Sequence, residues 1–244
     1  MSPKRSCAGA ALGYGSDRAD RGSPTLAFGR LRASGSVRAG KPSRLRSSRA
    51  DRSRRPGRGA WTGNRGILHR GREIVRFHAH EHWITCALRF KDRWHEQWRP
   101  HHFTWLYFHD EAVSFAAGHR PCAECRRAAY NAYREAWVAV LGATLPSAKT
   151  IDHQLHAERI VRGTHRRRMH PMAWQELPDG AFVALESGPA VVLDATLVTW
   201  TVDGYGERSG RPSRGEAAVI TPPSSVAALR AGYPVQIDNG ARLA

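Results

Sequence analysis

Residues 83–90 alternate between apolar and polar or small side chains. Because neighbouring side chains of a strand point to opposite faces, this pattern predicts a half-buried strand. The apolar positions expected on its inner face are Ile84, Cys86, Leu88 and Phe90. A second, aromatic-rich strand is expected over residues 103–108.

Three helices are predicted to follow. Asp110 is a favourable N-cap for a short helix that ends near Ala117, before Gly118. A helix of about four turns comes after Cys125 and ends at Gly142, and another is expected over residues 151–162. The inward-facing side chains of the helix after Cys125 are expected to be Tyr130, Tyr133, Trp137 and either Val140 or Leu141. Those of the helix over 151–162 are expected to be Ile151, Leu155 and Ile160.

From Leu177 onward, short apolar segments alternate with turn residues, which is typical of short strands. Strands are expected over 182–185, 190–193, 197–202 and 217–221, with a loop over 204–215. Ser224 is expected to cap a last short helix that ends near Ala231. The predicted fold class is α+β, in which a small α/β half precedes a mostly β half. The three predicted regions are a basic tail (1–60), an α/β region (61–170) and a small, mostly β region (171–244).

The positive charge of the chain is concentrated at its start. The 244 residues carry a formal charge of +17, yet residues 1–60 alone hold 15 Lys and Arg against three acids. This Ser-, Gly- and Arg-rich segment has few apolar side chains, so we expect it to be disordered. It is interpreted as a basic arm that contacts phosphates, as a targeting segment, or as a product of a misplaced translation start.

A membrane protein is not indicated by the sequence. No apolar run approaches the roughly 18 residues of a membrane-spanning helix. The first ten residues also lack the apolar stretch of a secretory signal. We therefore expect a cytoplasmic protein without a membrane partner.

The pair Cys122-x2-Cys125 is the strongest chemical signal. Two thiolates at this spacing can bind one tetrahedral zinc ion, although a redox pair or two ordinary buried thiols would show the same spacing. Zinc needs further ligands, and Cys86 is the best third, whereas Cys7 lies in the basic tail. Candidates for a fourth ligand are the histidines close in sequence, His78, His80, His82, His95, His101, His102 and His119. If no residue fills the fourth coordination position, the metal would be catalytic rather than structural.

Residues 108–126, FHDEAVSFAAGHRPCAECR, resemble the second half of the zinc-binding domain of the Ada family, which responds to DNA alkylation. The resemblance implies zinc at Cys122 and Cys125, and it places Cys86 in the family's earlier Cys-x3-Cys pair. Phe90 stands where the second cysteine of that pair is expected, and His119 replaces an aromatic residue. The resemblance therefore implies zinc binding, and it does not extend to methyl transfer. Of the candidate histidines, we expect His119 to be the fourth ligand, beside Cys86, Cys122 and Cys125.

A polar group is predicted on the helix over residues 151–162. Asp152, His156 and Arg159 are spaced to share one face, with Glu158 beside them. The simplest interpretation is a solvated face with an ordinary Asp–His pair. Alternatively, Asp152, His156 and Glu158 form a catalytic acid–base group, with the arginine as a phosphate clamp.

Tryptophan and basic residues are interleaved from residue 83 to residue 105, and further arginines flank the Cys-x2-Cys pair. Aromatic faces beside cations can stack bases and contact phosphates, although large aromatic side chains are also common in cores. The candidate nucleic-acid-binding residues are Arg89, Arg93, Arg120, Arg126, Arg127, Trp94 and Trp98.

Three functions follow from these observations. The first is a zinc-binding, nucleic-acid-associated protein, with DNA preferred over RNA, acting in DNA repair or its regulation. The second is a metal-assisted hydrolase or nuclease that uses zinc or the group of Asp152, His156 and Glu158. The third is a non-catalytic interaction protein in which zinc only stabilises the fold.

Overall fold

The computed structural model describes residues 59–142 and 144–244, so the predicted basic tail lies outside the described residues except for Gly59 and Ala60. The helices are α1 (Glu111–Ala116), α2 (Arg127–Leu141), α3 (Ala148–Arg159), α4 (Pro223–Arg230), α5 (Gly240–Leu243) and the 3-10 helix η1 (Trp174–Glu176). The first strands are β1 (Trp61–Asn64), β2 (His69–Arg70), β3 (Glu73–Ile74), β4 (Ile84–Ala87), β5 (Leu106–Phe108) and β6 (Arg120–Pro121). The later strands are β7 (His170–Ala173), β8 (Phe182–Leu185), β9 (Gly188–Leu193), β10 (Thr196–Thr201), β11 (Gly204–Gly210) and β12 (Glu216–Val219). The predicted α+β class is confirmed.

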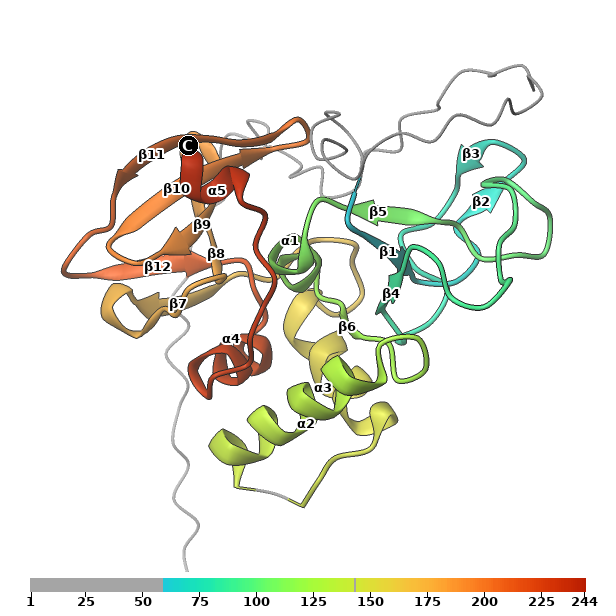
Figure 1. Cartoon of the computed structure of the whole chain (residues 1–244), viewed down its shortest axis with the longest axis horizontal. Coiled ribbons are helices and arrows are strands. Elements are labelled where there is room, and N and C mark those ends of the chain that lie inside the picture. The colour runs from blue at the N-terminus through green and yellow to red at the C-terminus, as the bar shows by residue number, and fades with distance from the viewer. Residues whose placement is uncertain (1–58, 143) are drawn as a thin grey trace, which may run out of the picture.

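The first half of the described chain forms a small sheet with the order β5-β1-β4-β6, at the right of Figure 1. Strand β4 is antiparallel to β1 but parallel to β6, with Ile84 opposite Arg120 and Thr85 opposite Pro121. This pairing places the end of β4 next to the turn that follows β6. Cys86 therefore lies next to the segment that holds the other two described cysteines.

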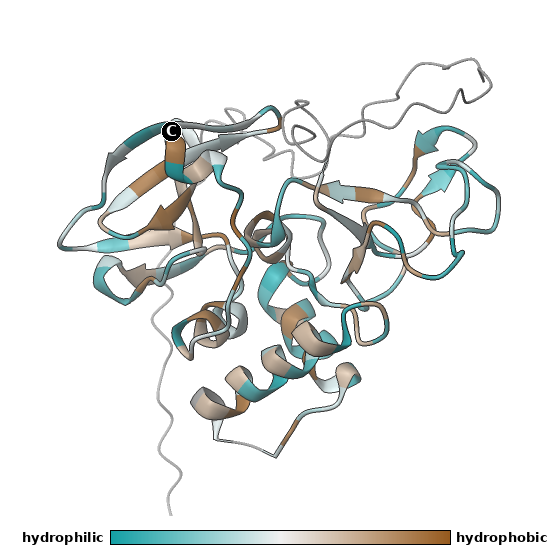
Figure 2. Ribbon diagram, in the orientation of Figure 1, coloured by the Kyte–Doolittle hydropathy of each residue, from teal (hydrophilic) through white to brown (hydrophobic). Residues whose placement is uncertain are grey.

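The second half forms a six-stranded antiparallel sheet with the order β11-β10-β9-β8-β12-β7. Strands of this sheet are among the most hydrophobic parts of the ribbon in Figure 2. Helices α2, α3 and α4 gather beside it in Figure 1, and α1 lies between the two sheets. One buried cluster joins helix residues such as Tyr133 and Trp137 to sheet residues such as Val183 and Val192. The regions predicted as 61–170 and 171–244 thus share a hydrophobic core.

The predicted limits of α1 and α2 agree with the structure, whereas α3 begins and ends three residues earlier than the expected range of 151–162. Asp110 is the N-cap of α1, where its carboxylate accepts a hydrogen bond of 2.7 Å from the Val113 amide. Gly118, with φ of +81°, follows that helix, and Gly142 ends α2 in the left-handed conformation. Tyr130, Tyr133 and Trp137 are buried along α2, as the apolar stripe predicts.

Three details of the prediction were wrong. The inner face of β4 carries Thr85, preceded by the buried Trp83, whereas Leu88 is exposed. The expected loop over 204–215 contains strand β11, which pairs with β10. Helix α4 has Pro222 as its N-cap, because the hydroxyl and amide of Ser224 both donate to Glu158 instead.

No helix among the described residues has both the length and the hydrophobicity needed to cross a membrane.

Candidate metal centre

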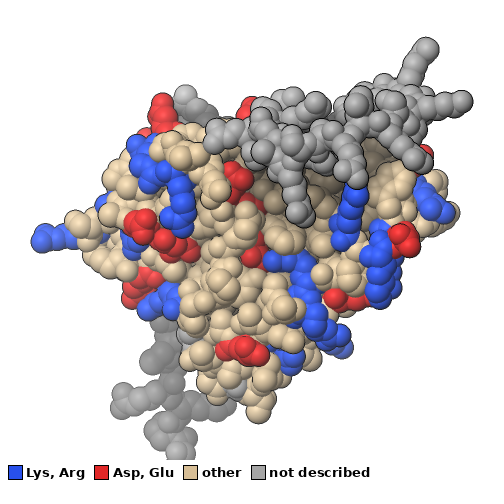
Figure 3. Space-filling view, viewed as in Figure 1, with Lys and Arg blue, Asp and Glu red and all other residues tan. Residues whose placement is uncertain are grey.

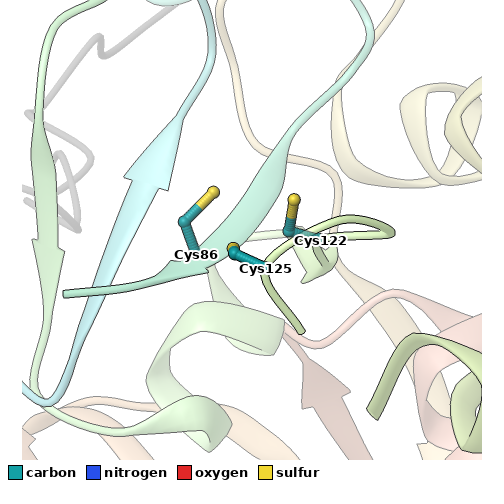
Figure 4. Close-up of side chains that lie close together, drawn as sticks. All are labelled: Cys86, Cys122 and Cys125. Carbon is teal, nitrogen blue, oxygen red and sulfur yellow. The ribbon is translucent and has the colours of Figure 1, made fainter. Parts of the chain in front are cut away.

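Cys86, Cys122 and Cys125 form one group whose sulfur atoms all lie within 4.8 Å of one another. Figure 4 shows Cys86 on strand β4 and the other two cysteines on the turn beyond β6. The strand pairing described above brings these separate parts of the chain together. The structure confirms that the three cysteines form a group that could hold a metal ion.

Backbone amides are directed at two of these sulfurs. The amide of Glu124 donates to Sγ of Cys122, and the amide of Ala87 donates to Sγ of Cys125, both at 3.4 Å. The turn itself is fixed by hydrogen bonds from the Cys122 amide to Thr85 and from the Arg126 amide to Cys122. Such N–H donors stabilise thiolates and orient them as ligands.

The thiols also influence one another's ionisation. Hydrogen bonds from the thiols of Cys125 and Cys86 lower the pKa of Cys122. Hydrogen bonds to Cys122 and Cys125, followed by burial, raise the pKa of Cys86. One sulfur is thus favoured as a thiolate, and that is the form that binds metals.

The geometry fits a tetrahedral metal site. With metal–sulfur distances of about 2.3 Å, the sulfurs of a zinc–thiolate site lie about 3.8 Å apart. In the structure the three sulfurs lie within 4.8 Å of one another, so a small inward movement of the side chains would bring them to this spacing. Three soft sulfur donors suit zinc better than they suit magnesium or calcium, which prefer oxygen.

His119 does not join the cysteines, contrary to its expected role as fourth ligand. Its ring is fully buried between strand β5 and Trp83, and its Nε2 accepts a hydrogen bond of 3.2 Å from Nε of Arg65. The other candidate histidines are also outside the group among the described residues. The described residues thus offer three candidate ligands, and a tetrahedral metal bound by them would need a fourth donor.

A cavity of about 400 Å³ opens directly on the cysteine group. All three cysteines line it, together with Glu124 and several side chains from the segment between β4 and β5. The aromatic and basic lining residues are Phe90, Arg93, Trp94, His95, Arg99, His102, Phe103 and Trp105. We call this the cysteine–aromatic pocket. Its volume falls in the range of small-molecule sites, and its lining is largely apolar with a few polar groups.

Three rings that contact one another line the pocket: His95 is stacked on Trp105, and Phe103 meets both edge-on. His95 lies 4.7 Å from Trp105 and 4.8 Å from Phe103, measured between ring centroids. The side chain of His95 is buried, and its Nε2 has no hydrogen-bond partner among the described residues. Trp94 contrasts with these rings, since 73% of it is exposed. The pocket therefore offers a flat ligand both the contacting rings around His95 and the solvent-exposed ring of Trp94.

The candidate nucleic-acid-binding residues divide into two sets. Arg120 and Arg126 are held in buried ion pairs with Asp152 at 2.7 Å and Glu111 at 2.6 Å, so neither presents its charge at the surface. Arg89, Arg93 and Arg127 are exposed. Trp94 lines the pocket, whereas Trp98 packs edge-on against His69. In Figure 3, Lys and Arg side chains appear on the right-hand part of the molecule and also on its left-hand part.

The predicted group on α3 has other partners. Asp152 is buried and accepts two hydrogen bonds from Arg120, at 2.8 and 2.7 Å, so this helix face is not solvated. Glu158 accepts from the Ser224 hydroxyl at 2.6 Å and from its amide at 3.0 Å. His156 lies beside Arg159, with 3.1 Å between Nδ1 and the guanidinium. Both carboxylates therefore stabilise the fold rather than converge on one site.

No protein-family model, curated protein or solved structure matches this chain. The site must therefore be interpreted from its own residues. Several of them were not singled out from the sequence as site residues, namely Phe90, Phe103, Glu124 and Asn64. Glu124 could have been predicted as a site residue, because it lies between the two cysteines of the Cys-x2-Cys pair.

Proposed function

We propose that the chain is a zinc-binding, nucleic-acid-associated protein, with Cys86, Cys122 and Cys125 as the zinc ligands. Zinc is favoured because the donors are three sulfurs and because backbone amides support two of them. The bound ion would cross-link strand β4 to the turn before α2 and so stabilise this half of the fold.

One observation carries the nucleic-acid assignment. The three cysteines share a cavity with the contacting rings of His95, Phe103 and Trp105 and with the exposed Trp94. Every nucleobase has a flat face that stacks on aromatic side chains, and an unpaired base can enter a pocket that a duplex cannot. We therefore propose that the cysteine–aromatic pocket binds an unpaired base.

The charge around the pocket supports this proposal. Arg93 and Arg99 line the cavity, and Arg89 and Arg127 are exposed on the neighbouring segments. Glu124 offsets part of this charge through contacts with Arg93 at 2.7 Å and Lys91 at 3.8 Å. Basic side chains at the mouth would contact the phosphates that flank the base and hold the strand in place.

The resemblance of residues 108–126 to the Ada zinc domain suggests a setting for this activity. It favours DNA as the nucleic acid, and repair of DNA or its regulation as the process. This part of the proposal is separate from the chemistry of the pocket, which would accept a base from either nucleic acid.

Fluorescence anisotropy with labelled oligonucleotides tests the function. We expect the zinc-loaded full chain to bind single-stranded DNA more tightly than duplex DNA of the same sequence. Its affinity should decrease as salt increases, because binding releases counterions from phosphates. Equal affinity for both forms of DNA would argue against base binding in the pocket, and an absence of binding at low salt would overturn the assignment.

Metal-assisted hydrolysis is the second candidate, and one observation favours it. The carboxylate of Glu124 lines the same cavity as the three cysteines, which leave one metal position open. Zinc with an open position acts as a Lewis acid, and a neighbouring carboxylate can act as a general base. Hydrolysis of nucleic-acid substrates that Glu124→Gln abolishes while zinc content is unchanged would establish this function. Turnover that survives this substitution would exclude Glu124 as the base.

A further inference from the structure

Two segments that are far apart in the sequence meet on the surface beside helix α3. The first is the β2–β3 hairpin with the residues that follow it (69–78), and the second is the turn after α3 (160–168). The rings of Phe77 and His165 are stacked, with 5.1 Å between centroids and 21° between planes. His78 also lies 5.0 Å from His156 of α3, so the two segments are joined along this edge. We call the exposed residues around the contact the hairpin–turn surface, namely Arg76, Phe77, Val161, Arg162, His165 and Arg166.

Backbone hydrogen bonds hold both segments in place. In the turn, the Val161 amide donates to the carbonyl of Arg166 at 3.0 Å, and the Thr164 amide donates to the carbonyl of Val161 at 3.0 Å. In the hairpin, the Val75 amide donates to the carbonyl of Leu68 at 2.9 Å. The backbone polar groups are thus paired within the chain, and the side chains are left to contact an external partner.

The charge of the two segments is positive and is not neutralised within the described part of the chain. Their exposed arginines are Arg70, Arg72, Arg76, Arg162, Arg166 and Arg168. Glu73 is the only carboxylate in residues 69–78 and 160–168, and none of these arginines forms an ion pair with a described residue. By contrast, the exposed Arg93 and Arg230 are paired with Glu124 and Glu176. The surface therefore retains its charge for an anionic partner.

An aromatic ring is exposed among these charges. Phe77 is 51% exposed, although His165 stacks on one face of its ring. Val161, from the same turn as His165, is 38% exposed. A face that was only charged and solvated would not need exposed apolar groups at this contact. The ring therefore points to a ligand that has a flat face as well as negative charge.

We propose that the hairpin–turn surface binds a single-stranded nucleic acid, with Arg76, Arg162 and Arg166 on its phosphates and Phe77 stacked on a base. Each nucleotide carries both an anionic phosphate and a flat base. The surface offers the matching groups side by side, because Arg76 precedes Phe77 and Arg166 follows His165. An acidic peptide would match the arginines, but its carboxylates do not come with a flat ring in each unit.

This contact is separate from the cysteine–aromatic pocket, since none of its residues lines that cavity. The inference rests on the proposed nucleic-acid function and adds a second contact to it. The pocket would select an unpaired base, and the hairpin–turn surface would add affinity that depends little on sequence.

The salt dependence of binding tests the arginines. Fluorescence anisotropy with a labelled single-stranded oligonucleotide compares the zinc-loaded full chain with two triple variants. The surface variant carries Arg76→Gln, Arg162→Gln and Arg166→Gln. The matched control removes the same charge from exposed positions outside both sites, through Lys149→Gln, Arg214→Gln and Arg242→Gln. Residues 1–58 are present in every chain, so a difference in salt dependence reports the substitutions.

We expect the surface variant to depend less on salt than the wild type. Loss of three phosphate contacts should reduce the slope of log Kd against log salt by about 2, because each contact with a single strand contributes about 0.7. The control should keep the wild-type slope. Equal slopes in the two triple variants would overturn the proposal.

Phe77→Ala tests the stacking contact. It should weaken binding roughly 5- to 150-fold and leave the salt slope unchanged, because the ring stacks on a base and carries no charge. Tyr107→Ala is the control, since Tyr107 is an exposed aromatic residue outside both sites. Equal affinities of these two variants would contradict base stacking on this surface.

The outcomes separate this inference from the function on which it rests. If the wild type does not bind the oligonucleotide, both are overturned. If Trp94→Ala weakens binding and the surface variants do not, the pocket assignment stands and the hairpin–turn surface is rejected. A poly-Glu peptide that binds as tightly as an oligonucleotide of equal charge, with the same loss in the surface variant, would identify a site for an acidic protein and would also overturn the proposal.

Discussion

The amide of Ala87 donates a hydrogen bond of 3.4 Å to Sγ of Cys125, although 38 residues separate the two. This contact joins the end of strand β4 to the turn before α2. It places Cys86, the residue before Ala87, against the Cys-x2-Cys pair. The hydrogen bond with Cys122 raises the pKa of Cys125, and the Ala87 amide acts in the opposite direction. The three-cysteine group is therefore a product of the backbone pairing of β4 and β6 as much as of the cysteines themselves.

The buried pair of Arg120 and Asp152 should be important for stability. Replacing Asp152 with Ala leaves a buried guanidinium without its partner, which is expected to cost about 3–5 kcal/mol of unfolding free energy. Arg93→Ala breaks an ion pair that is exposed, so a cost below about 1 kcal/mol is expected. Urea unfolding followed by circular dichroism measures both. Similar costs for the two variants would show that Asp152 is not a structural residue.

Trp94 should contribute to ligand binding without contributing to stability. Because most of its surface is exposed at the pocket, Trp94→Ala should fold normally. Loss of one stacked base is expected to weaken single-stranded DNA binding by about 1–3 kcal/mol, or roughly 5- to 150-fold. Tyr107→Ala is the matched control, since Tyr107 is an exposed aromatic residue outside the pocket lining. Equal affinities of the two variants would remove Trp94 from the site.

Stability should decrease at mildly acidic pH because of His119. Burial, followed by the positive charges of Arg65 and Arg159, lowers the pKa of His119 well below 6.5. Below pH 6.5 the unfolded chain therefore binds a proton that the folded chain does not, so acid favours unfolding. The contribution is complete above pH 6.5 and decreases by about 1.4 kcal/mol per pH unit until the folded pKa is reached.

Unfolding free energies between pH 7.5 and 5.5 measure this effect. The stability of His119→Gln should depend less on pH than that of the wild type, whatever its absolute stability. The exposed His101, replaced with Asn because its φ is +62°, provides the control and should leave the slope unchanged. If His119→Gln retains the wild-type slope, another group controls the acid sensitivity.

The sequence predicted local features better than distant contacts. The caps at Asp110 and Gly142 were predictable because they depend on residues within one helical turn. The proximity of Cys86 to the Cys-x2-Cys pair was predictable because a metal site needs more than two ligands and few cysteines are available. The partner of Arg120 was not, since Asp152 lies 32 residues away and both residues have many possible charge partners.

Strand β4 shows why burial was misjudged. Alternation correctly placed Ile84, Cys86 and Leu88 on one face, but it could not reveal what that face contacts. The face borders the cysteine–aromatic pocket, and the core lies behind Thr85 and Trp83. A polar threonine faces the core because its hydroxyl donates a hydrogen bond of 2.9 Å to Ser114. Strand periodicity identifies two faces, and only tertiary packing decides which of them is buried.

The metal content of purified full-length chains tests the central claim most directly. We expect about one zinc ion per chain in the wild type and in Cys7→Ser, which keeps the three-cysteine group intact. Cys122→Ser should lose zinc, because two thiolates alone are too few for a tight site. Cys86→Ser should also lose zinc if Cys86 is the third ligand. Full zinc occupancy in Cys122→Ser would contradict the account.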